Sequence, residues 1–183
     1  MKTQVKLRLQ LKQFLANEPL DTITVKRLAS ACGINRQTFY YHYRDIYELL
    51  ADVYINEKIP NLDSVFTWEK ALDEIFNYII NNRQFINNTA QSAGHDLLDA
   101  FFNNVFYNVL LTEINVIDSN KKLNEEEARF LSSFYSAGFA NIVMQWIDGT
   151  QEEAPLSVID RLINFFEGSI ERVIQRYYRK QNE

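Results

Sequence analysis

The stretch NRQTFYYHYRD at residues 35–45 gathers the side chains of this chain that are best suited to chemistry. Its amide, hydroxyl and guanidinium groups donate hydrogen bonds, and its tyrosines offer aromatic surface. His42, one of two histidines in the chain, lies among them. No carboxylate or nucleophile flanks His42 in the pattern of a catalytic triad, so its imidazole is better suited to hydrogen bonding than to acid–base catalysis. Such groups favour contact with a polyanion, whose phosphates and base edges accept hydrogen bonds.

The charge of the chain is divided unevenly along its length. Residues 1–44 carry eight lysines and arginines against two acidic residues, a balance of +6, whereas the remaining residues carry 11 basic and 22 acidic side chains, a balance of −11. This split suggests an end that faces a polyanion, joined to a body that repels one. Solvated surface faces are the alternative explanation of the same charges.

Motifs of catalysis and metal binding are missing from the sequence. His42 and His95 are far apart, no Gly-rich phosphate loop occurs, and neither HExxH nor CxxC spacing is present. The acidic run at residues 125–127 is better explained as charge at a helix start than as paired catalytic carboxylates. We therefore predict no enzyme activity, no cofactor and no metal site, and a helical enzyme is the least favoured class.

The sequence also carries signals about its compartment. Cys32 is the single cysteine, which fits a reducing environment and a small buried side chain. The first residues are interleaved with lysines and lack the apolar run of a secretory signal. No segment reaches the roughly 20 apolar residues that a membrane span needs. We expect a cytoplasmic protein that does not associate with a membrane.

Residues that break helices are few: three prolines and five glycines among 183 residues. Together with apolar residues at helical spacing, this composition predicts an all-α protein. We predict an N-terminal three-helix helix-turn-helix domain at residues 1–58 and a C-terminal helical bundle at residues 59–183. The first predicted helix ends before Glu18. The other predicted helices occupy residues 25–32, 35–42, 45–58, 68–82, 96–117, 128–147 and 156–179, with an Asn-rich break near 87–95.

Polar residues mark the starts of the short N-terminal helices. Thr24 and Asn35 are placed to cap the second and third helices, and Asp45 with Glu48 has the spacing of a capping box before the fourth. Gly33 supplies the left-handed residue that ends the second helix. Two short helices joined by a glycine turn have the helix-turn-helix pattern, and the stretch quoted first lies on the second of them.

The third helix has two different faces. At 100° per residue, Phe39 and Tyr43 point to one side, which predicts that they belong to the core. Gln37, Thr38 and Tyr41 point to the other side, so the outward face consists of hydrogen-bonding groups. The first turn of such a helix is where a recognition helix meets base edges.

Cations at the helix starts support the same interpretation. Arg36 lies in the first turn of the third helix, and Lys26 and Arg27 lie in the first turn of the second. The positive end of a helix dipole disfavours cations there. An anion docked at both helix starts offsets that cost, and phosphate suits such a position, so we predict DNA as the partner.

Residues 5–58 resemble the DNA-binding domain of the TetR family of bacterial transcriptional regulators. The resemblance is carried by ITVKRLASACGINRQTFYYHYRDIYELL, with its apolar-Thr-Val start, glycine turn, aromatic core and Leu-Leu pair. Within the family, RQTFYYHYRDIYELL is most similar to regulators of dihydroxyacetone kinase operons. One departure is Ile46, where the family often has a lysine that contacts phosphate.

The resemblance implies a double-stranded DNA operator as partner and a specific set of contacts. It also implies a fold of about nine helices, in which residues 59–183 form a body for ligand binding and dimerisation. The residues that approach bases or phosphates are then Asn35, Arg36, Gln37 and Thr38. Those that contact the DNA backbone, a sugar or a thymine methyl group are Tyr40, Tyr41 and His42, and those that hold flanking phosphates are Thr24 and Arg44.

The last two long helices carry more apolar surface than one core contact requires. This excess suggests a homodimer, in which helices of two copies pack across a two-fold axis. A bundle within one chain is the alternative. The residues that we predict for the dimer interface are Tyr135, Phe139, Ile142, Leu162, Phe166, Ile170, Val173 and Tyr177.

The middle helices are rich in aromatic residues that suit the wall of a ligand pocket. Plain core packing is the alternative for each of them. The candidate pocket residues are Trp68, Phe76, Tyr78, Phe85, His95, Phe102, Phe106 and Tyr107.

These observations lead to one functional hypothesis with alternatives. We predict a homodimeric transcriptional regulator that reads a palindromic operator through the major groove and acts as a repressor released by a small-molecule effector. The alternative is an activator, or a DNA-binding protein that a partner protein controls without a small-molecule pocket.

Overall fold

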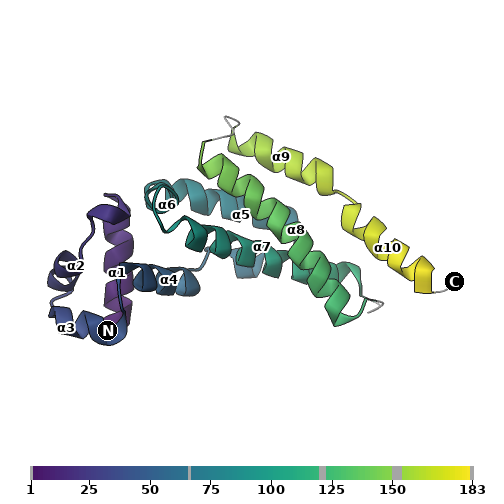
Figure 1. Ribbon diagram of the computed structural model, residues 1–183. Coiled ribbons are helices and arrows are strands. Elements are labelled where there is room, and N and C mark those ends of the chain that lie inside the picture. Colours follow the sequence, from purple (N-terminus) through teal and green to yellow (C-terminus); the bar gives the residue numbers. More distant parts are fainter. Residues whose placement is uncertain (1, 66, 120–122, 150–153, 182–183) are drawn as a thin grey trace. The chain divides into compact units, whose positions relative to one another are not determined.

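The computed structural model describes residues 2–65, 67–119, 123–149 and 154–181 of the chain. Within these ranges all regular structure is helical (Figure 1), which confirms the predicted all-α class. The α-helices are α1 (Thr3–Leu15), α2 (Val25–Ala31), α3 (Arg36–His42), α4 (Ile46–Asn56), α5 (Trp68–Asn81), α6 (Arg83–Ala90), α7 (His95–Ile117), α8 (Glu125–Ile147), α9 (Pro155–Phe166) and α10 (Ser169–Gln181), and the 3-10 helices are η1 (Leu20–Thr22) and η2 (Leu62–Ser64).

The chain forms two compact units. The first contains Met1–Ile59 and Tyr78–Phe101, and the second contains Pro60–Asn77 and Phe102–Glu183. Helices α5 and α7 therefore contribute residues to both units. The predicted division into domains at residue 58 stays a prediction.

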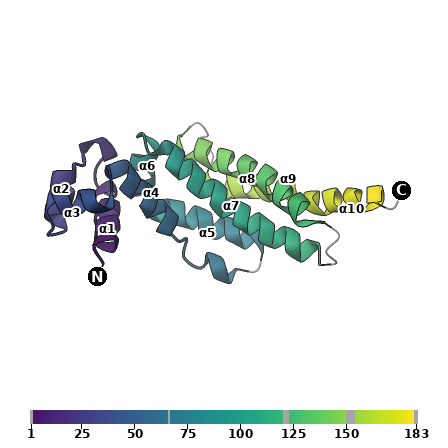
Figure 2. The same ribbon diagram turned by 60° about the horizontal axis from the view of Figure 1, so that its bottom comes forward.

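The first unit is built round α1. Leu7, Leu11 and Leu15 are all buried, and α1 packs against α2, α4 and α6. Phe39 of α3 and Leu49 of α4 are fully buried as well. Figures 1 and 2 both show α2 and α3 next to α1. One face of α3 is thus held in the apolar core of the first unit.

Helix α6 occupies part of the region for which we predicted a polar break. Phe85 and Ile86 are buried, and the Asn88 side chain donates a hydrogen bond to the carbonyl of Leu15 at 2.8 Å. Leu15 ends α1, so Asn88 satisfies a carbonyl that the helix itself leaves unpaired. The predicted break was therefore wrong at residues 87–90. The contact that holds this segment joins residues far apart in the sequence, so local spacing could not predict it.

Phe139 of α8 lies at the centre of the second unit. Its ring centroid is 5.4 Å from that of Phe106 on α7, 4.2 Å from that of Phe166 on α9 and 6.1 Å from that of Trp68 on α5. Rings from four helices thus meet in tilted, stacked and edge-on contacts, which are favourable arrangements for aromatic pairs.

The last predicted helix is in fact two helices. Proline at the first position opens α9, and the chain leaves the helix at Glu167 and Gly168 before α10 begins. Gly168 has a φ of +67°, in the left-handed region that glycine adopts readily. The single helix predicted over 156–179 was therefore wrong, because the apolar pattern on both sides concealed the glycine.

The longest helices, α7 and α8, each have 23 residues and carry polar as well as apolar side chains. No helix in the described ranges is both long enough and apolar enough to cross a membrane.

Candidate nucleic-acid interface

The turn between α2 and α3 ends one helix and directs the next. Gly33 has a φ of +66°. The N–H groups of Gly33 and Ile34 donate to the carbonyls of Ser30 and Ala29, at 3.1 and 3.0 Å. This pair of bonds forms a Schellman motif, which confirms that Gly33 ends the second helix. A Cβ at position 33 would meet nothing within 4 Å, so backbone conformation rather than space favours glycine here.

Polar side chains cap the starts of both helices of the motif, as predicted. The Thr24 hydroxyl accepts a hydrogen bond from the Arg27 N–H at 3.3 Å. Asn35 Oδ1 accepts from the backbone N–H and the hydroxyl of Thr38, at 2.8 and 2.9 Å. Because Asn35 Oδ1 and the N–H and O–H of Thr38 are engaged in the start of α3, the groups left for a further partner are the Asn35 amide nitrogen and the Thr38 hydroxyl oxygen.

Helix α3 separates a packed face from an exposed face, as the helical wheel predicted. Phe39 is fully buried and Tyr43 is 5% exposed, whereas Tyr41 is 85% exposed and Tyr40 is 49% exposed. The His42 ring lies edge-on to the Tyr41 ring, with centroids 5.1 Å apart. A tyrosine as exposed as Tyr41 contributes little to the core, so its phenol is free to meet a ligand.

The arginines in the first turns of α2 and α3 have different surroundings. Arg27 donates from two guanidinium nitrogens to both carboxylate oxygens of Glu18, each at 2.8 Å, and to the carbonyl of Thr22 at 3.0 Å. The hydrogen bond from Arg27 lowers the pKa of Glu18, and Glu18 in turn raises the pKa of Arg27. Arg36 is exposed, and its guanidinium makes no ion pair with any residue that the structure describes.

This difference corrects one prediction. We expected unpaired cations at both helix starts, but Glu18 already supplies the anion for Arg27 at the start of α2. Arg36 keeps the predicted character of a cation without an anionic partner, as far as the described part of the chain extends, and Lys26 is exposed beside Arg27. The anion-binding potential of the interface is therefore concentrated at the start of α3.

Tyr43 ties the end of α3 to α1 and α4. Its hydroxyl donates to Asp52 Oδ2 at 2.5 Å, and Arg8 Nη1 donates to the same oxygen at 2.9 Å. Burial, together with the Asp52 carboxylate, raises the pKa of Tyr43, so the phenol stays protonated and donates. Hydrogen bonds to a charged acceptor are strong, and these two fix the orientation of α3 against the rest of the first unit.

Arg44 lies at the junction of α3 and α4. Its Nε is 3.3 Å from Glu48 Oε2, and its backbone N–H donates to the same oxygen at 2.6 Å. Asp45 Oδ1 accepts from the Glu48 N–H at 2.8 Å, which is the first half of the predicted capping box. In the other half, Glu48 bonds to the backbone of Arg44 instead of Asp45. The Arg44 side chain is 85% exposed, so its weak pair with Glu48 leaves it able to exchange the carboxylate for a phosphate.

Two acidic partners in this region were not predicted from the sequence. Glu18 lies nine residues before Arg27, and Asp52 lies 44 residues after Arg8. No helical period connects these positions, so periodicity gave no sign of either pair. Composition offered one signal for Glu18, because it is one of only two acidic residues among the first 44.

The residues predicted for the dimer interface do not share one exposed face. Phe139 fills the centre of the second unit, and the break at Gly168 interrupts the face that we had continued from α9 into α10. Three of the residues are buried within the protomer: Phe139, Leu162 and Ile170. Five are partly exposed: Tyr135, Ile142, Phe166, Val173 and Tyr177.

The residues predicted for a ligand pocket are divided between the two units. Trp68 lines a cavity of about 20 Å³ in the second unit. Core packing accounts for five of the eight: Phe76, Tyr78, Phe85, Phe102 and Phe106 are buried. Three are partly exposed: Trp68, His95 and Tyr107. A pocket formed by this set stays a prediction.

Comparison with known proteins gives two family matches. Residues 12–53, which include α2, α3 and the turn between them, match the model of "Bacterial regulatory proteins, tetR family". Residues 67–168, more than half of the chain, match the model of "Transcriptional regulator C-terminal region". No curated protein matches the chain.

Comparison with solved structures gives a similar protein over nearly the whole chain. The structure of "Dihydroxyacetone kinase operon activator DhaS" matches with a TM-score of 0.64 and 20% sequence identity. The match covers 92% of this chain and 96% of that chain. At this identity the likeness concerns the fold.

Proposed function

The chain belongs to the TetR family of bacterial transcriptional regulators, and from this premise we propose that the exposed face of α3 makes its contact with operator DNA. The observation that carries the proposal is the position of Arg36 at the start of α3, a helix whose core face is fully packed. The Arg36 guanidinium is exposed, and no anionic group among the described residues pairs with it. The family match makes the chain a DNA-binding regulator of transcription. The proposal concerns which residues meet the DNA.

The contacts divide by position on α3. Arg36 and Gln37 lie in the first turn, where a recognition helix in the major groove reaches base edges, and an arginine there suits bidentate binding to guanine. Tyr41 and His42 lie at the other end of the helix, where their hydrogen-bonding groups reach the DNA backbone. Thr24, Asn35, Thr38, Tyr40 and Arg44 complete the contact surface.

We propose that the working form is a homodimer, which the apolar surface of α8 and α9 supports. Phe130 and Phe134 lie one turn apart on α8 and are 63% and 67% exposed. Leu156 and Phe165 on α9 are 71% and 78% exposed. Figure 1 shows α8 and α9 side by side, so these residues belong to neighbouring helices of one bundle. A second copy would remove these side chains from water.

A homodimer accounts for a symmetric operator. Two copies of α3 about 34 Å apart meet successive major grooves on one face of DNA, so the half-sites form an inverted repeat. A dimer seated across these grooves excludes polymerase from the same DNA, which makes repression the proposed effect. An effector would release the DNA if it bound more tightly to a conformation of the dimer in which the two recognition helices no longer match the spacing of the major grooves. Since the chromosome lies in the bacterial cytoplasm, we propose that the protein works there.

Activation is the second candidate for the sign of regulation. It is favoured by the similar structure of DhaS, whose name describes an operon activator. Expression of a reporter behind the bound promoter distinguishes the two, since loss of a repressor raises expression and loss of an activator lowers it.

Measurements of DNA binding, of the mass of the complex and of a variant test the proposed function. Sequencing of genomic fragments retained by the protein should give an inverted repeat, and the mass of the complex should correspond to two protomers per repeat. Tyr41→Ala should abolish retention of the fragment while the thermal unfolding temperature stays unchanged, because Tyr41 is 85% exposed. Wild-type retention by the Tyr41→Ala variant would contradict the assigned face of α3.

A further inference from the structure

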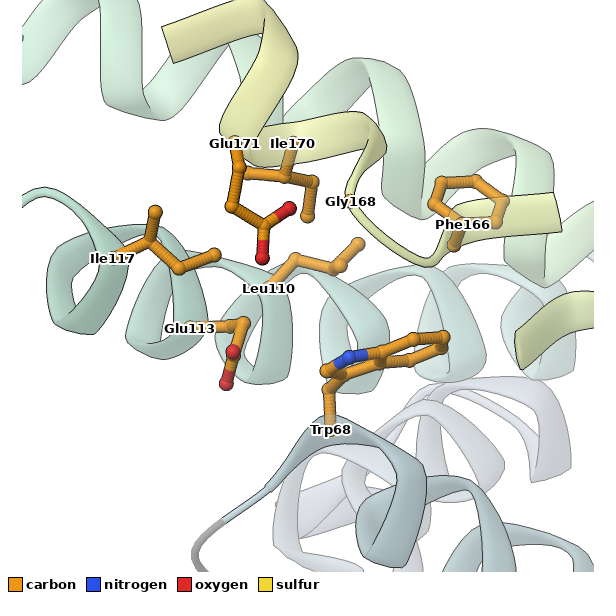
Figure 3. A pocket seen from close by; sticks show the side chains of 8 residues that line it. All are labelled: Trp68, Leu110, Glu113, Ile117, Phe166, Gly168, Ile170 and Glu171. Atoms are coloured by element: carbon orange, nitrogen blue, oxygen red, sulfur yellow. The ribbon is translucent and has the colours of Figure 1, made fainter. Parts of the chain in front are cut away.

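Carboxylates have different surroundings in the two units. Glu113 and Glu171 line the small cavity of the second unit, which has a volume of about 20 Å³ and room for one water-sized group (Figure 3). Neither of them forms an ion pair with a residue that the structure describes. In the first unit, Asp52 on α4 and Glu57 at the end of α4 are each bonded to side chains from two other parts of the chain. These two carboxylates therefore mark a region in which side-chain positions are fixed.

One partner of each carboxylate is a cation on α1. Arg8 Nη1 donates to Asp52 Oδ2 at 2.9 Å, and Lys12 Nζ donates to Glu57 Oε1. Arg8 and Lys12 are four residues apart, so they lie on the same side of α1. The side chains of Asp52 and Glu57 are 25% and 12% exposed, so water screens these pairs less than it screens pairs on the open surface. Helix α1 is thus joined to α4 and its end at two points.

The other partner of each carboxylate is the hydroxyl of a buried tyrosine. Tyr43 donates to Asp52 Oδ2 at 2.5 Å, and Tyr78 donates to Glu57 Oε1 at 3.0 Å. Burial and the neighbouring carboxylate raise the pKa of each phenol, so both phenols stay protonated and donate. The two bonds are chemically alike, but Tyr43 directly follows α3, whereas Tyr78 belongs to α5.

The bond from Tyr43 holds the end of α3. This helix has seven residues and is therefore only about 10 Å long. Phe39 fixes the middle of α3 in the core, and the chain becomes extended at Tyr43, where φ is −143° and ψ is 140°. A helix held at Phe39 alone could tilt about that residue, and the buried bond from Tyr43 to Asp52 restricts the tilt. Because Arg36 lies at the opposite end of α3, such a tilt would displace its guanidinium.

Tyr43 and Asp52 are not themselves available to DNA. Tyr43 is buried, and its hydroxyl is engaged by Asp52. Both oxygens of Asp52 accept hydrogen bonds within the protein, Oδ2 from Arg8 and Tyr43 and Oδ1 from the Asn56 amide at 2.9 Å. The negative charge of Asp52 would also repel a phosphate. Any effect of these two residues on DNA binding is therefore exerted through the position of α3.

We propose that Tyr43 and Asp52 are positioning residues for operator recognition, and that their hydrogen bond holds α3 in the orientation in which Arg36 and Gln37 meet base edges. Base contacts depend on the distance and angle of each hydrogen bond, so a tilt of α3 weakens them. Contacts to phosphates are mainly electrostatic and tolerate the same displacement. Residues that touch no DNA thus contribute to sequence specificity. The inference rests on the proposed function, because it concerns how the proposed face of α3 is held.

The test compares two variants of the full-length protein in which phenylalanine replaces tyrosine. Tyr43→Phe and its matched control Tyr78→Phe each keep a buried ring and remove one hydroxyl that donates to a carboxylate. Fluorescence anisotropy at fixed salt measures the affinity for a duplex with the inverted repeat that the wild-type protein retains, and for a duplex in which this repeat is scrambled. The assay temperature lies below the melting temperatures of both variants, so that folded protein is compared.

The two variants should differ in sequence-specific binding. Tyr43→Phe should lower the affinity for the inverted repeat by about tenfold, as the loss of one base contact would, and leave the affinity for the scrambled duplex unchanged. Tyr78→Phe should bind both duplexes as the wild type does. Both melting temperatures should fall, because each variant removes a hydrogen bond to a charged acceptor. Wild-type affinity of Tyr43→Phe for the repeat would overturn the proposal. An equal loss in both variants, or an equal loss on both duplexes, would also overturn it, since the hydroxyl would then act on the fold in general.

The Asp52→Ala variant tests the same bond from the side of the carboxylate. It should lower the affinity for the inverted repeat at least as much as Tyr43→Phe does, because Asp52 also accepts from Arg8. The double variant should bind the repeat as Asp52→Ala does, since the second substitution removes a bond that is already lost. Additive losses would overturn the action of Tyr43 through Asp52.

A contact residue in the same assay separates this inference from the proposed function. Tyr41→Ala removes a side chain that the proposed function places against the DNA. Reduced affinity of Tyr41→Ala for the repeat, beside wild-type affinity of Tyr43→Phe, would overturn the positioning role alone. Wild-type affinity of Tyr41→Ala would contradict the proposed face of α3 and the inference with it.

Discussion

The starts of α2 and α3 look alike in the sequence and differ in the folded protein. Each has a polar cap, Thr24 or Asn35, and each has an arginine in its first turn. At α2 the charge of Arg27 is neutralised by Glu18, whereas at α3 Arg36 has no anion within the described ranges. The comparison shows two roles for a cation at a helix start. It stabilises the fold where an acidic side chain pairs with it, and it is available to a ligand where no acidic side chain does.

The strongest test of the difference between Arg27 and Arg36 is to replace each arginine with alanine. Arg36→Ala should weaken operator binding by about 1–3 kcal/mol, or roughly 5- to 150-fold, because the variant cannot form a bidentate hydrogen bond to a base. Arg27→Ala should leave operator affinity nearly unchanged and lower the thermal unfolding temperature, because its partner is Glu18. Fluorescence anisotropy at fixed salt measures the affinities. Equal decreases in affinity in the two variants would mean that Arg27 also meets DNA, contrary to the difference between the two helix starts.

Salt dependence tells whether Arg36 acts on a base or on a phosphate. For each phosphate that a variant no longer neutralises, the slope of log K against log[salt] should become shallower by about 0.9. Arg36→Ala should keep the wild-type slope if its guanidinium meets base edges alone, and should show the shallower slope if it meets a phosphate. Arg27→Ala serves as the control, and its slope should equal that of the wild type.

The capping groups at these helix starts could be predicted from the sequence, because each bond joins residues three apart. The side chains of Thr24, Asn35 and Asp45 accept from the N–H groups three residues later, and Gly33 adopts the left-handed conformation that ends α2. Asn124 at the start of α8 follows the same rule and forms a capping box with Glu127. Local hydrogen bonding leaves a local signature, and this is why the helix-turn-helix motif could be predicted almost residue by residue.

Features that depend on distant contacts could not be predicted in this way. The pair of Arg27 with Glu18 and the bond from Asn88 to Leu15 both join separate elements, so no spacing rule reports them. The face of α8 that holds Phe139 has the same apolar character as the face that exposes Phe134, and only packing decides which is buried. The residues of the candidate DNA face could therefore be predicted from the sequence. Which of its cations pair within the protein and which stay available to a ligand could not.

The next prediction compares the two caps. Asn35→Ala should reduce the free energy of unfolding by about 1 kcal/mol, since it removes two hydrogen bonds at the start of α3. Thr24→Ala should cost less, because the Thr24 cap is a single bond of 3.3 Å. Urea denaturation measures both. A larger decrease in Thr24→Ala would show that cap geometry does not set the stability of these helices.

An aspartate at position 35 separates capping from DNA contact in the same assay. Asn35→Asp keeps an oxygen that accepts from Thr38 and adds a negative charge that suits a helix start, so unfolding should be close to that of the wild type. The same charge repels phosphate, so operator affinity should fall. Retained affinity would place Asn35 away from the DNA backbone.

The smallest expected effect concerns the exposed pair at the start of α2. Because Arg27 lowers the pKa of Glu18, the pair stabilises the folded state at pH values above about 4.3, the ordinary pKa of a glutamate, and this contribution is lost as pH falls through the lowered value. Glu18→Gln should therefore unfold at a lower temperature than the wild type at pH 7, and the difference should shrink and then vanish as the pH falls through the lowered pKa of Glu18. The same substitution releases Arg27 from its anion, so operator affinity at pH 7 should rise slightly. A fall in affinity instead would mean that Glu18 holds the start of α2 in the position that DNA requires, and that the acid serves recognition as well as the fold.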